Sequence, residues 1–201
     1  MTIYPLFGLI GLGFLSLGLV HHGFGIESLA FSAYSFVLII FLVTDLRFWR
    51  VPRALAMLTI VAGLLLGYTK STDEFYARLI GGVVAFIFLW CVIIVFSFYL
   101  RLVSKIGSQQ FAMGSGDPLL LAAIGAFCGW QLLPGLLFLA SAQGVIVVCL
   151  LKLSNQTLRP PWPDAIPDSA PFGTFLCLAA LELAIFPQLD TKILTFIRSL
   201  I

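Results

Sequence analysis

Two aspartates that border long apolar runs have the residue type and placement for chemistry. Asp45 follows the run FSAYSFVLIIFLVT, and Asp117 precedes the run PLLLAAIGAF. An ionised aspartate in hydrocarbon costs about 2.5–3.5 kcal/mol, so acids at such positions are rare without a purpose. Two carboxyl groups a few ångströms apart share a proton and titrate as a pair. One can then act as base and the other as acid, which is the chemistry of aspartic proteolysis.

Two glycines precede the second acid in the segment AMGSGDPLLLAAIGAFCGW, and they allow two interpretations. In the first, Gly114 and Gly116 leave room for a substrate strand beside Asp117, because glycine has no side chain. In the second, Asp117 is the N-cap of a helix and Pro118 is its first residue, a combination that helix starts favour. Spacing alone leaves both interpretations open, and Asp45 can likewise be an acid that only marks a helix end.

The composition identifies the environment that surrounds these acids. The chain has 201 residues, of which 61% are hydrophobic and 10% charged, and its mean hydropathy is +1.10. The apolar runs are long enough for helices of about 20 residues and lack the alternation of a transmembrane barrel. We therefore expect an all-α, polytopic membrane helical bundle that forms a single domain over residues 1–201. The lipid bilayer is an expected partner, and the formal net charge of +2 gives no reason to expect nucleic acid.

Apolar runs, and the polar residues, glycines and prolines that separate them, predict about seven or eight transmembrane helices. The eighth helix is present if the amphipathic tail DTKILTFIRSLI completes another span instead of lying at the interface. The proline-rich stretch LSNQTLRPPWPDAIPDSA is predicted to be a surface loop. The seven predicted spans are 3–20, 29–44, 52–69, 79–100, 117–130, 133–151 and 171–187.

Lysine and arginine predict the orientation of this bundle, because cytoplasmic connections are enriched in both. Seven of them fall in alternate connections on the side of Asp45 and Asp117, and four fall on the opposite side. We therefore expect both acids near the cytoplasmic face, at a common depth where they can meet. The seven are Arg47, Arg50, Arg53, Arg101, Lys105, Lys152 and Arg159, and the four are Lys70, Arg78, Lys192 and Arg198.

The sequence gives no reason to expect a metal or a cofactor. The four cysteines lie in apolar segments without CxxC spacing, which indicates buried small side chains instead of a zinc or redox site. His21 and His22 stand near Glu27, but two histidines and one acid are an incomplete ligand set. The cysteines are Cys91, Cys128, Cys149 and Cys177.

Three segments resemble the bacterial type IV prepilin peptidases, the GxGD-type aspartic intramembrane peptidases that remove leaders from prepilins. TDLRFWRVPRALAMLTIVAGLLLG resembles their first catalytic segment, and GSGDPLLLAAIGAFCGWQLLP is similar to their GxGD segment. APFGTFLCLAA is similar to their late PFG segment. The three motifs, at 44–53, 112–134 and 170–180, occur in the family's order over about 140 residues.

The resemblance implies an inner-membrane endopeptidase that removes a short basic leader at the cytoplasmic face, after a glycine. Its substrates would be type IV prepilins or type II secretion pseudopilins, and it needs no cofactor. Asp45 and Asp117 would be the two catalytic acids, and Gly114 and Gly116 would form the turn that faces the substrate. The oligomeric state is not predicted.

Two departures from the family accompany this resemblance. Many members carry an additional cytoplasmic domain with paired cysteines, associated with methylation of the new amino terminus, and this chain lacks both. We therefore expect a short form without methyltransferase activity. Leu119 stands where many members have lysine, which we interpret as variation between subfamilies.

Three further acids receive weaker interpretations. Asp164 and Asp168, in the proline-rich loop, are hypothetical partners for the positive charge of a leader peptide. Glu182 should lie about 14–16 Å along the last long helix from its PFG start, too deep to join the pair. We interpret Glu182 as a structural residue. Three states remain open: it is protonated, it forms a hydrogen bond to a neighbouring helix, or it lies beside a polar cavity.

Two other functions remain open. Asp45, Asp117 and Glu182 could form the proton or cation path of a small transporter, although no ladder of acids or inverted repeat supports it. Alternatively, the chain could be a catalytically inactive member of the family that acts as an assembly factor. Retention of both acids and of the glycines disfavours this second alternative.

Overall fold

The computed structural model describes residue 13 and residues 25–103, 116–154, 171–186 and 188–200. The predicted first span, 3–20, therefore lies outside the described residues apart from Gly13. Gly114 and the proline-rich loop with Asp164 and Asp168 also lie outside them.

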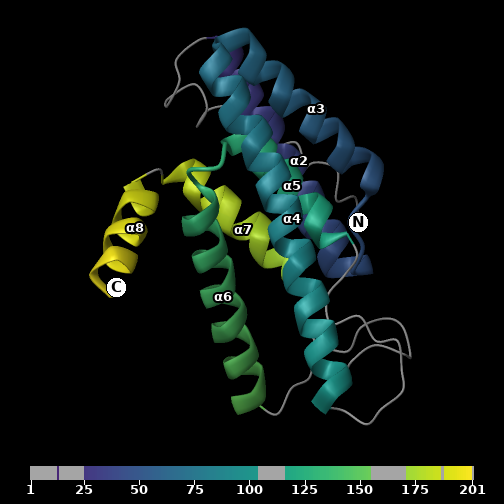
Figure 1. Ribbon diagram of the computed structural model, residues 1–201. Helices are drawn as coiled ribbons and strands as arrows, with labels where there is room; N and C mark the ends of the chain where they lie inside the picture. The colour runs from purple at the N-terminus through teal and green to yellow at the C-terminus, as the bar shows by residue number, and fades with distance from the viewer. Residues whose placement is uncertain (1–12, 14–24, 104–115, 155–170, 187, 201) are drawn as a thin grey trace.

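The described chain is helical throughout, as Figure 1 shows, which confirms the predicted helical membrane bundle. Four helices, α2, α3, α4 and α6, are long and apolar enough to cross a membrane, while α5 and α7 are shorter apolar helices. The helices are α2 (Ile26–Phe48), α3 (Arg53–Lys70), α4 (Thr72–Val103), α5 (Asp117–Cys128), α6 (Leu133–Leu153), α7 (Phe172–Ile185) and α8 (Gln188–Leu200).

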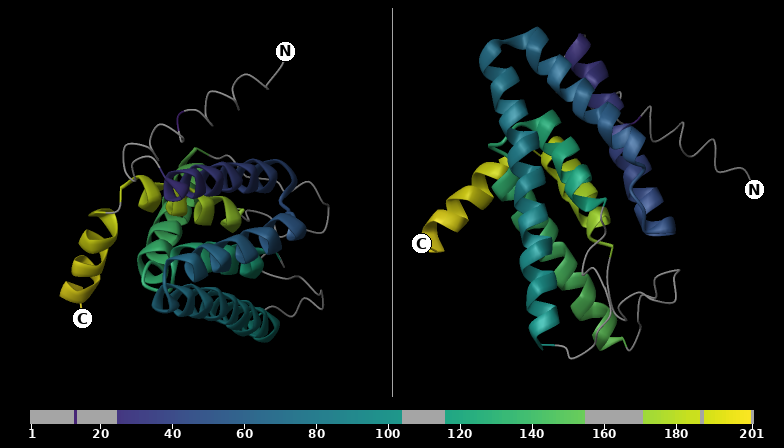
Figure 2. Two further views of the ribbon diagram at one scale, coloured as in Figure 1. Left: turned by 90° about the horizontal axis from the view of Figure 1, so that it is seen from above. Right: turned by 45° about the vertical axis from the view of Figure 1, so that its right-hand side comes forward.

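The two shorter helices form the centre of the bundle. Nine of the 12 residues of α5 and nine of the 14 residues of α7 are buried. At 1.5 Å per residue these helices are about 18 and 21 Å long, less than the roughly 30 Å of a hydrocarbon core. Both views in Figure 2 place them among α2, α3, α4 and α6. A short helix can begin inside the bundle, so its first residues can present polar groups there.

Glycines let α5 approach α3 and α4 closely. A Cβ atom at Gly63 on α3 would lie 2.5 Å from the carbonyl oxygen of Ala126 on α5. A Cβ atom at Gly125 on α5 would lie 2.5 Å from the carbonyl oxygen of Gly81 on α4. Such contacts are typical of helix pairs in membranes, where small residues allow backbones to pack. They hold the helix that begins with Asp117 in a fixed position.

The turn between α3 and α4 differs from the sequence-based boundary. Helix α4 begins at Thr72, seven residues before the predicted start at residue 79. The reason is a cap that joins Ser71 and Glu74, in which the Ser71 hydroxyl accepts a 3.1 Å hydrogen bond from the backbone N–H of Glu74. Asp73 and Glu74 also place negative charge in the first turn, where the helix dipole favours it.

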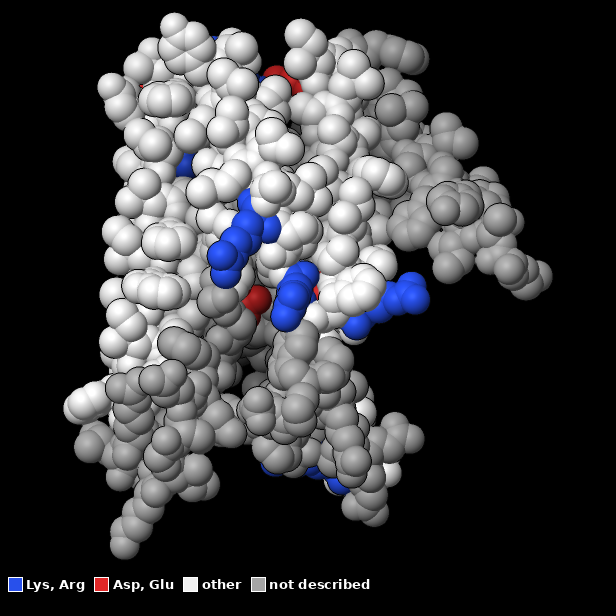
Figure 3. Space-filling model, turned by 90° about the vertical axis from the view of Figure 1, so that its right-hand side faces the viewer, with Lys and Arg blue, Asp and Glu red and all other residues white. Residues whose placement is uncertain are grey.

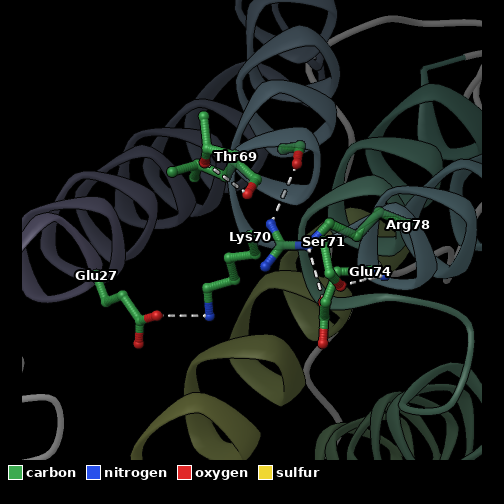
Figure 4. A network of polar contacts seen from close by, with 8 residues as sticks. Glu27, Thr69, Lys70, Ser71, Glu74 and Arg78 are labelled. Atoms are coloured by element: carbon green, nitrogen blue, oxygen red, sulfur yellow. Dashed lines mark hydrogen bonds and ion pairs between the residues drawn. The ribbon is translucent and has the colours of Figure 1, made fainter.

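Charged residues at this end of the bundle are paired with one another. Lys70 Nζ lies 3.0 Å from Glu27 Oε1, and this ion pair joins the end of α3 to the start of α2 (Figure 4). Arg78 donates a 3.1 Å hydrogen bond to the carbonyl oxygen of Gly63 and approaches Glu74. Glu27 and Asp45 lie at opposite ends of α2, about 27 Å apart along the helix. The polar network of Figure 4 is therefore remote from the aspartates.

Helix α8 lies to one side of the bundle in Figure 1. It contacts α6 and α7, and Leu189 and Ile193 pack against the apolar core. The predicted span 171–187 is therefore α7 alone, and the amphipathic tail forms a separate 13-residue helix.

Candidate active site

Asp45 lies in the last turn of α2 and is 4% exposed. The helix ends at Phe48, and Trp49 then takes a left-handed conformation with φ of 52°. The backbone N–H of Trp49 donates a 2.8 Å hydrogen bond to the carbonyl oxygen of Asp45, which closes this end of the helix. The chain can then turn sharply through Pro52 into α3, so Asp45 is held beside a tight connection.

Asp117 is the first residue of α5 and is 5% exposed. The N-cap of this helix is Gly116, and Pro118 is its second residue. The predicted cap with Asp117 at the N-cap and Pro118 at the first helical position is therefore wrong by one residue. Proline remains suited to this place, because the first turn of a helix does not use its N–H.

The first turn of α7 brings the two acids together. A Cβ atom at Gly173 would lie 2.9 Å from Asp45 Oδ2 and 3.1 Å from Asp117 Oδ1. The separation of the two carboxylate oxygens therefore cannot exceed the sum of these distances. Asp45 and Asp117 are 72 positions apart in the sequence, yet their carboxyl groups face one glycine of a third helix. The absence of a side chain at Gly173 lets both carboxyl groups lie close to the backbone of α7.

Thr174 is a further polar contact of this site. Its hydroxyl donates a 2.9 Å hydrogen bond to Asp45 Oδ2, and its backbone N–H also donates to the Asp45 carboxyl. Thr174 is the third residue of α7, whose N-cap, Pro171, has no side-chain capping group. Asp45 from α2 thus receives donors at the start of α7, where helix N–H groups lack partners within the helix.

The arrangement is suited to acid–base chemistry. Two carboxyl groups that approach one point can share a proton, activate a water molecule and donate a proton to a leaving group. Among the residues that the structure describes, no group of three histidine, cysteine or acidic side chains could hold a metal ion.

The two predicted substrate glycines have different outcomes. Gly114 lies outside the described residues. A Cβ atom at Gly116 would lie 2.9 Å from Val51 Cβ, so this glycine lets the start of α5 pack against the α2–α3 connection. A role of Gly116 toward substrate stays a prediction, and its packing against Val51 is a structural reason for glycine at the same position.

Glu182 does not join the two aspartates. On α7 it lies nine residues after Gly173, about 14 Å along the helix. Its Oε2 accepts a 2.7 Å hydrogen bond from Gln143 Nε2 on α6. This contact confirms one of the structural interpretations, a hydrogen bond to a neighbouring helix.

Basic side chains border this part of the surface. Arg47, Arg50 and Arg53 are exposed where α2 ends and α3 begins. Figure 3 shows basic side chains beside a hollow of one face, with acidic atoms visible next to them. The position agrees with arginines that anchor a helix end near lipid phosphates.

Sequence reasoning assigned no role to Gly173, Thr174 or Gln143. The PFG segment was noticed as a family feature, and the structure now places its glycine against both acids. A signal for Thr174 was present in its position directly after PFG, at an expected helix start. Gln143 carried no comparable signal, because a single amide in an apolar run can have many partners.

The chain belongs to the type IV leader peptidase family, whose model matches residues 32–149. The matched range contains both aspartates, and Gly173 and Thr174 follow it.

The relatives similar to this chain include the following three, and each is a prepilin leader peptidase/N-methyltransferase. The protein of Pseudomonas putida is 30% identical over 178 residues, which cover 88% of this chain and 56% of the relative. That of Legionella pneumophila is 32% identical over 80% of this chain and 51% of the relative. That of Myxococcus xanthus is 33% identical over 58% of this chain and 32% of the relative. The matches thus cover from a third to just over half of these relatives' length. No solved structure is significantly similar to this one.

Proposed function

We propose that this protein is a membrane aspartic endopeptidase that removes the short basic leader from type IV prepilins or type II secretion pseudopilins. The observation that carries the proposal is the approach of Asp45 Oδ2 and Asp117 Oδ1 to one point beside Gly173. Membership of the leader peptidase family supports the same reaction and the same class of substrate.

In the proposed reaction, the ionised carboxyl of the pair takes a proton from water as the water attacks the scissile carbonyl. The protonated carboxyl polarises the carbonyl oxygen and then supports departure of the amine. The peptide C–N bond breaks, the leader gains a carboxyl group and the mature chain gains a free amine. No covalent intermediate with the protein is formed.

The substrate is proposed to reach the pair through glycine-lined space. Gly173 places no side chain against the two carboxyl groups, and Gly114 and Gly116 would let an extended segment approach the backbone before Asp117. Both acids are less than one-tenth exposed, so a bound segment would have only a small amount of water to exclude.

The reaction is proposed to occur at the cytoplasmic face of the bacterial inner membrane. Support comes from the excess of lysine and arginine in the connections on the side of Asp45 and Asp117. The basic leader would meet Asp164 and Asp168 on that side. The proposal is limited to peptide cleavage and includes no methyl transfer.

The proposal is tested with the full chain reconstituted in liposomes and a synthetic prepilin peptide with a basic leader, a glycine and an apolar segment. We expect one cleavage after the glycine, mapped by mass spectrometry of both fragments, and no hydroxamate when hydroxylamine is added. A hydroxamate on the leader fragment would indicate an acyl-enzyme and contradict the aspartic mechanism. Absence of cleavage of every peptide of this design would contradict the proposed function.

A further inference from the structure

The hydroxyl of Thr174 differs from five other threonine hydroxyls in the described helices. Those five donate to carbonyl oxygens of their own helix, as is usual for threonine inside a helix. Thr174 instead donates from α7 to the Asp45 carboxyl on α2, across 129 positions of sequence. The threonines with bonds inside their own helix are Thr44, Thr59, Thr69, Thr191 and Thr195.

Thr174 lies in the first turn of α7. It is the third helical residue, so the carbonyl oxygen three positions before it is that of the N-cap residue, Pro171. Ser28, the third residue of α2, donates to the carbonyl oxygen of its own N-cap residue, Gly25, whereas Thr174 donates across the interface. The side chain is 7% exposed, which removes water as an alternative partner. Buried polar groups are normally hydrogen-bonded, and the partner of this hydroxyl is Asp45 Oδ2 at 2.9 Å.

A carboxyl group needs such a partner if it is to act in a defined direction. The terminal torsion of aspartate is broad, so the two oxygens of an isolated side chain exchange easily. Asp45 Oδ2 is the oxygen that meets Thr174 Oγ1 and also lies beside Gly173, on the side where Asp117 Oδ1 approaches. The Thr174 hydroxyl therefore bonds the Asp45 oxygen that lies beside Gly173, and the backbone N–H of Thr174 is a second donor to the same carboxyl group.

We propose that Thr174 is a positioning residue that holds Asp45 Oδ2 toward Asp117 for peptide cleavage. The inference rests on the proposed aspartic mechanism and adds a residue outside the range matched by the family model. Thr174 acts through Asp45 and has no chemical step of its own. Loss of its hydroxyl lets the Asp45 carboxyl rotate away from the reacting water while the substrate-binding surface is unchanged.

The experiment compares four variants of the full chain in liposomes: Thr174→Val, Thr174→Ser, Thr59→Val and Asp45→Asn. Valine keeps the shape of threonine without the hydroxyl, and serine keeps the hydroxyl. Thr59→Val is the matched control, since Thr59 is also 7% exposed but donates to Leu55 of its own helix. Steady-state cleavage of a prepilin peptide gives kcat and KM, and thermal unfolding in detergent gives the folded fraction.

We expect Thr174→Val to lower kcat about tenfold or more, since hydrogen bonds to charged groups contribute more than neutral ones. KM should stay within about twofold, because a positioning residue acts on the chemical step. Thr174→Ser should recover most of kcat, and Thr59→Val should behave as the wild type. Should Thr174→Val fail to fold, the kcat of Thr174→Ser decides, and a tenfold loss there contradicts the proposal.

The outcomes separate this inference from the proposed function. If Asp45→Asn is inactive while Thr174→Val has the kcat of Thr59→Val, the positioning role is wrong and the aspartic pair stands. If Thr174→Val raises KM and leaves kcat unchanged, Thr174 contacts substrate instead, and the positioning role is again wrong. If Asp45→Asn cuts as fast as the wild type, the aspartic mechanism itself is wrong, and the inference is lost with it.

Discussion

Acidic side chains lie at both ends of α7, and their arrangements differ. At its start, Gly173 and Thr174 meet the carboxyl groups of Asp45 and Asp117, which come from two other helices. Toward its end, Glu182 belongs to α7 itself and is bonded to the neutral amide of Gln143 at 2.7 Å. The first arrangement gathers two acids at one point, and the second satisfies one acid with one donor.

This difference separates chemistry from structure within one helix. Two carboxyl groups close together cost free energy unless they share a proton, so their approach serves stability poorly. An acid that accepts a hydrogen bond from an amide instead links two helices, which stabilises a membrane bundle modestly. The comparison predicts that changes at the start of α7 affect activity and that changes near its end affect stability.

Among changes that keep both aspartates, the largest effect is expected from Gly173→Ala. The new methyl group would lie 2.9 Å from Asp45 Oδ2 and 3.1 Å from Asp117 Oδ1, so it would occupy the space between the acids. We expect kcat for leader cleavage to fall about a hundredfold or more, because small displacements of reacting groups are costly. The matched control is Gly144→Ala, whose Cβ would meet Phe175 Cδ2 at 3.4 Å, and which should keep activity. Equal activity of the two variants would contradict the close contact between Gly173 and the two acids.

A packing change away from both ends of α7 tests whether instability alone reduces cleavage. A Cβ atom from Gly81→Ala would lie 2.8 Å from the backbone carbon of Gly129 and would also meet Gly125. We expect the free energy of unfolding to fall by about 1–3 kcal/mol, as in overpacked cores, with kcat per folded molecule unchanged. Gly82→Ala is the control, because its nearest contact, Ala126 Cβ, is at 3.2 Å. If Gly81→Ala abolished kcat in folded protein, the separation of packing from chemistry would fail.

The smallest effect is expected near the end of α7. Glu182→Leu leaves the Gln143 amide without its acceptor, and Gln143 Oε1 is already buried without a described partner. The free energy of unfolding should fall by about 0.5–2 kcal/mol, the range for hydrogen bonds between membrane helices. Adding Gln143→Leu should recover part of this loss, because no buried polar group is then unpaired. Thermal unfolding of the single and double variants measures the change in the free energy of unfolding. Additive losses from the two substitutions would contradict the hydrogen bond between Glu182 and Gln143.

Much of the fold could be predicted because a membrane helix requires a long run of apolar residues. The predicted spans 29–44 and 52–69 correspond to α2 and α3, and their boundaries agree within a few residues. The start of α4 was not predicted correctly. Hydropathy assigns the polar stretch before residue 79 to a loop, but the cap between Ser71 and Glu74 allows this stretch to form a helix. Polar caps act locally and leave little trace in hydrophobicity.

The candidate site could be predicted in part. Asp45 and Asp117 were singled out because charge is expensive beside apolar runs, and their common side followed from the positions of lysine and arginine. Their meeting at Gly173 could not be predicted, since it depends on α7, which begins 55 residues after the start of α5. The hydrogen bond between Thr174 and Asp45 could not be predicted either, because a threonine in the first turn of a helix more often bonds to its own helix.

The most direct test of the aspartic pair is leader cleavage by Asp45→Asn, Asp117→Asn and Glu182→Gln at equal amounts of folded protein. Each variant replaces a carboxyl group with an amide of the same shape, and only the acids at the start of α7 are proposed to react. We predict that the two asparagine variants lose about a hundredfold to ten-thousandfold in kcat, while Glu182→Gln stays within about threefold of the wild type. Wild-type cleavage by either asparagine variant, or an equal loss in Glu182→Gln, would contradict the account.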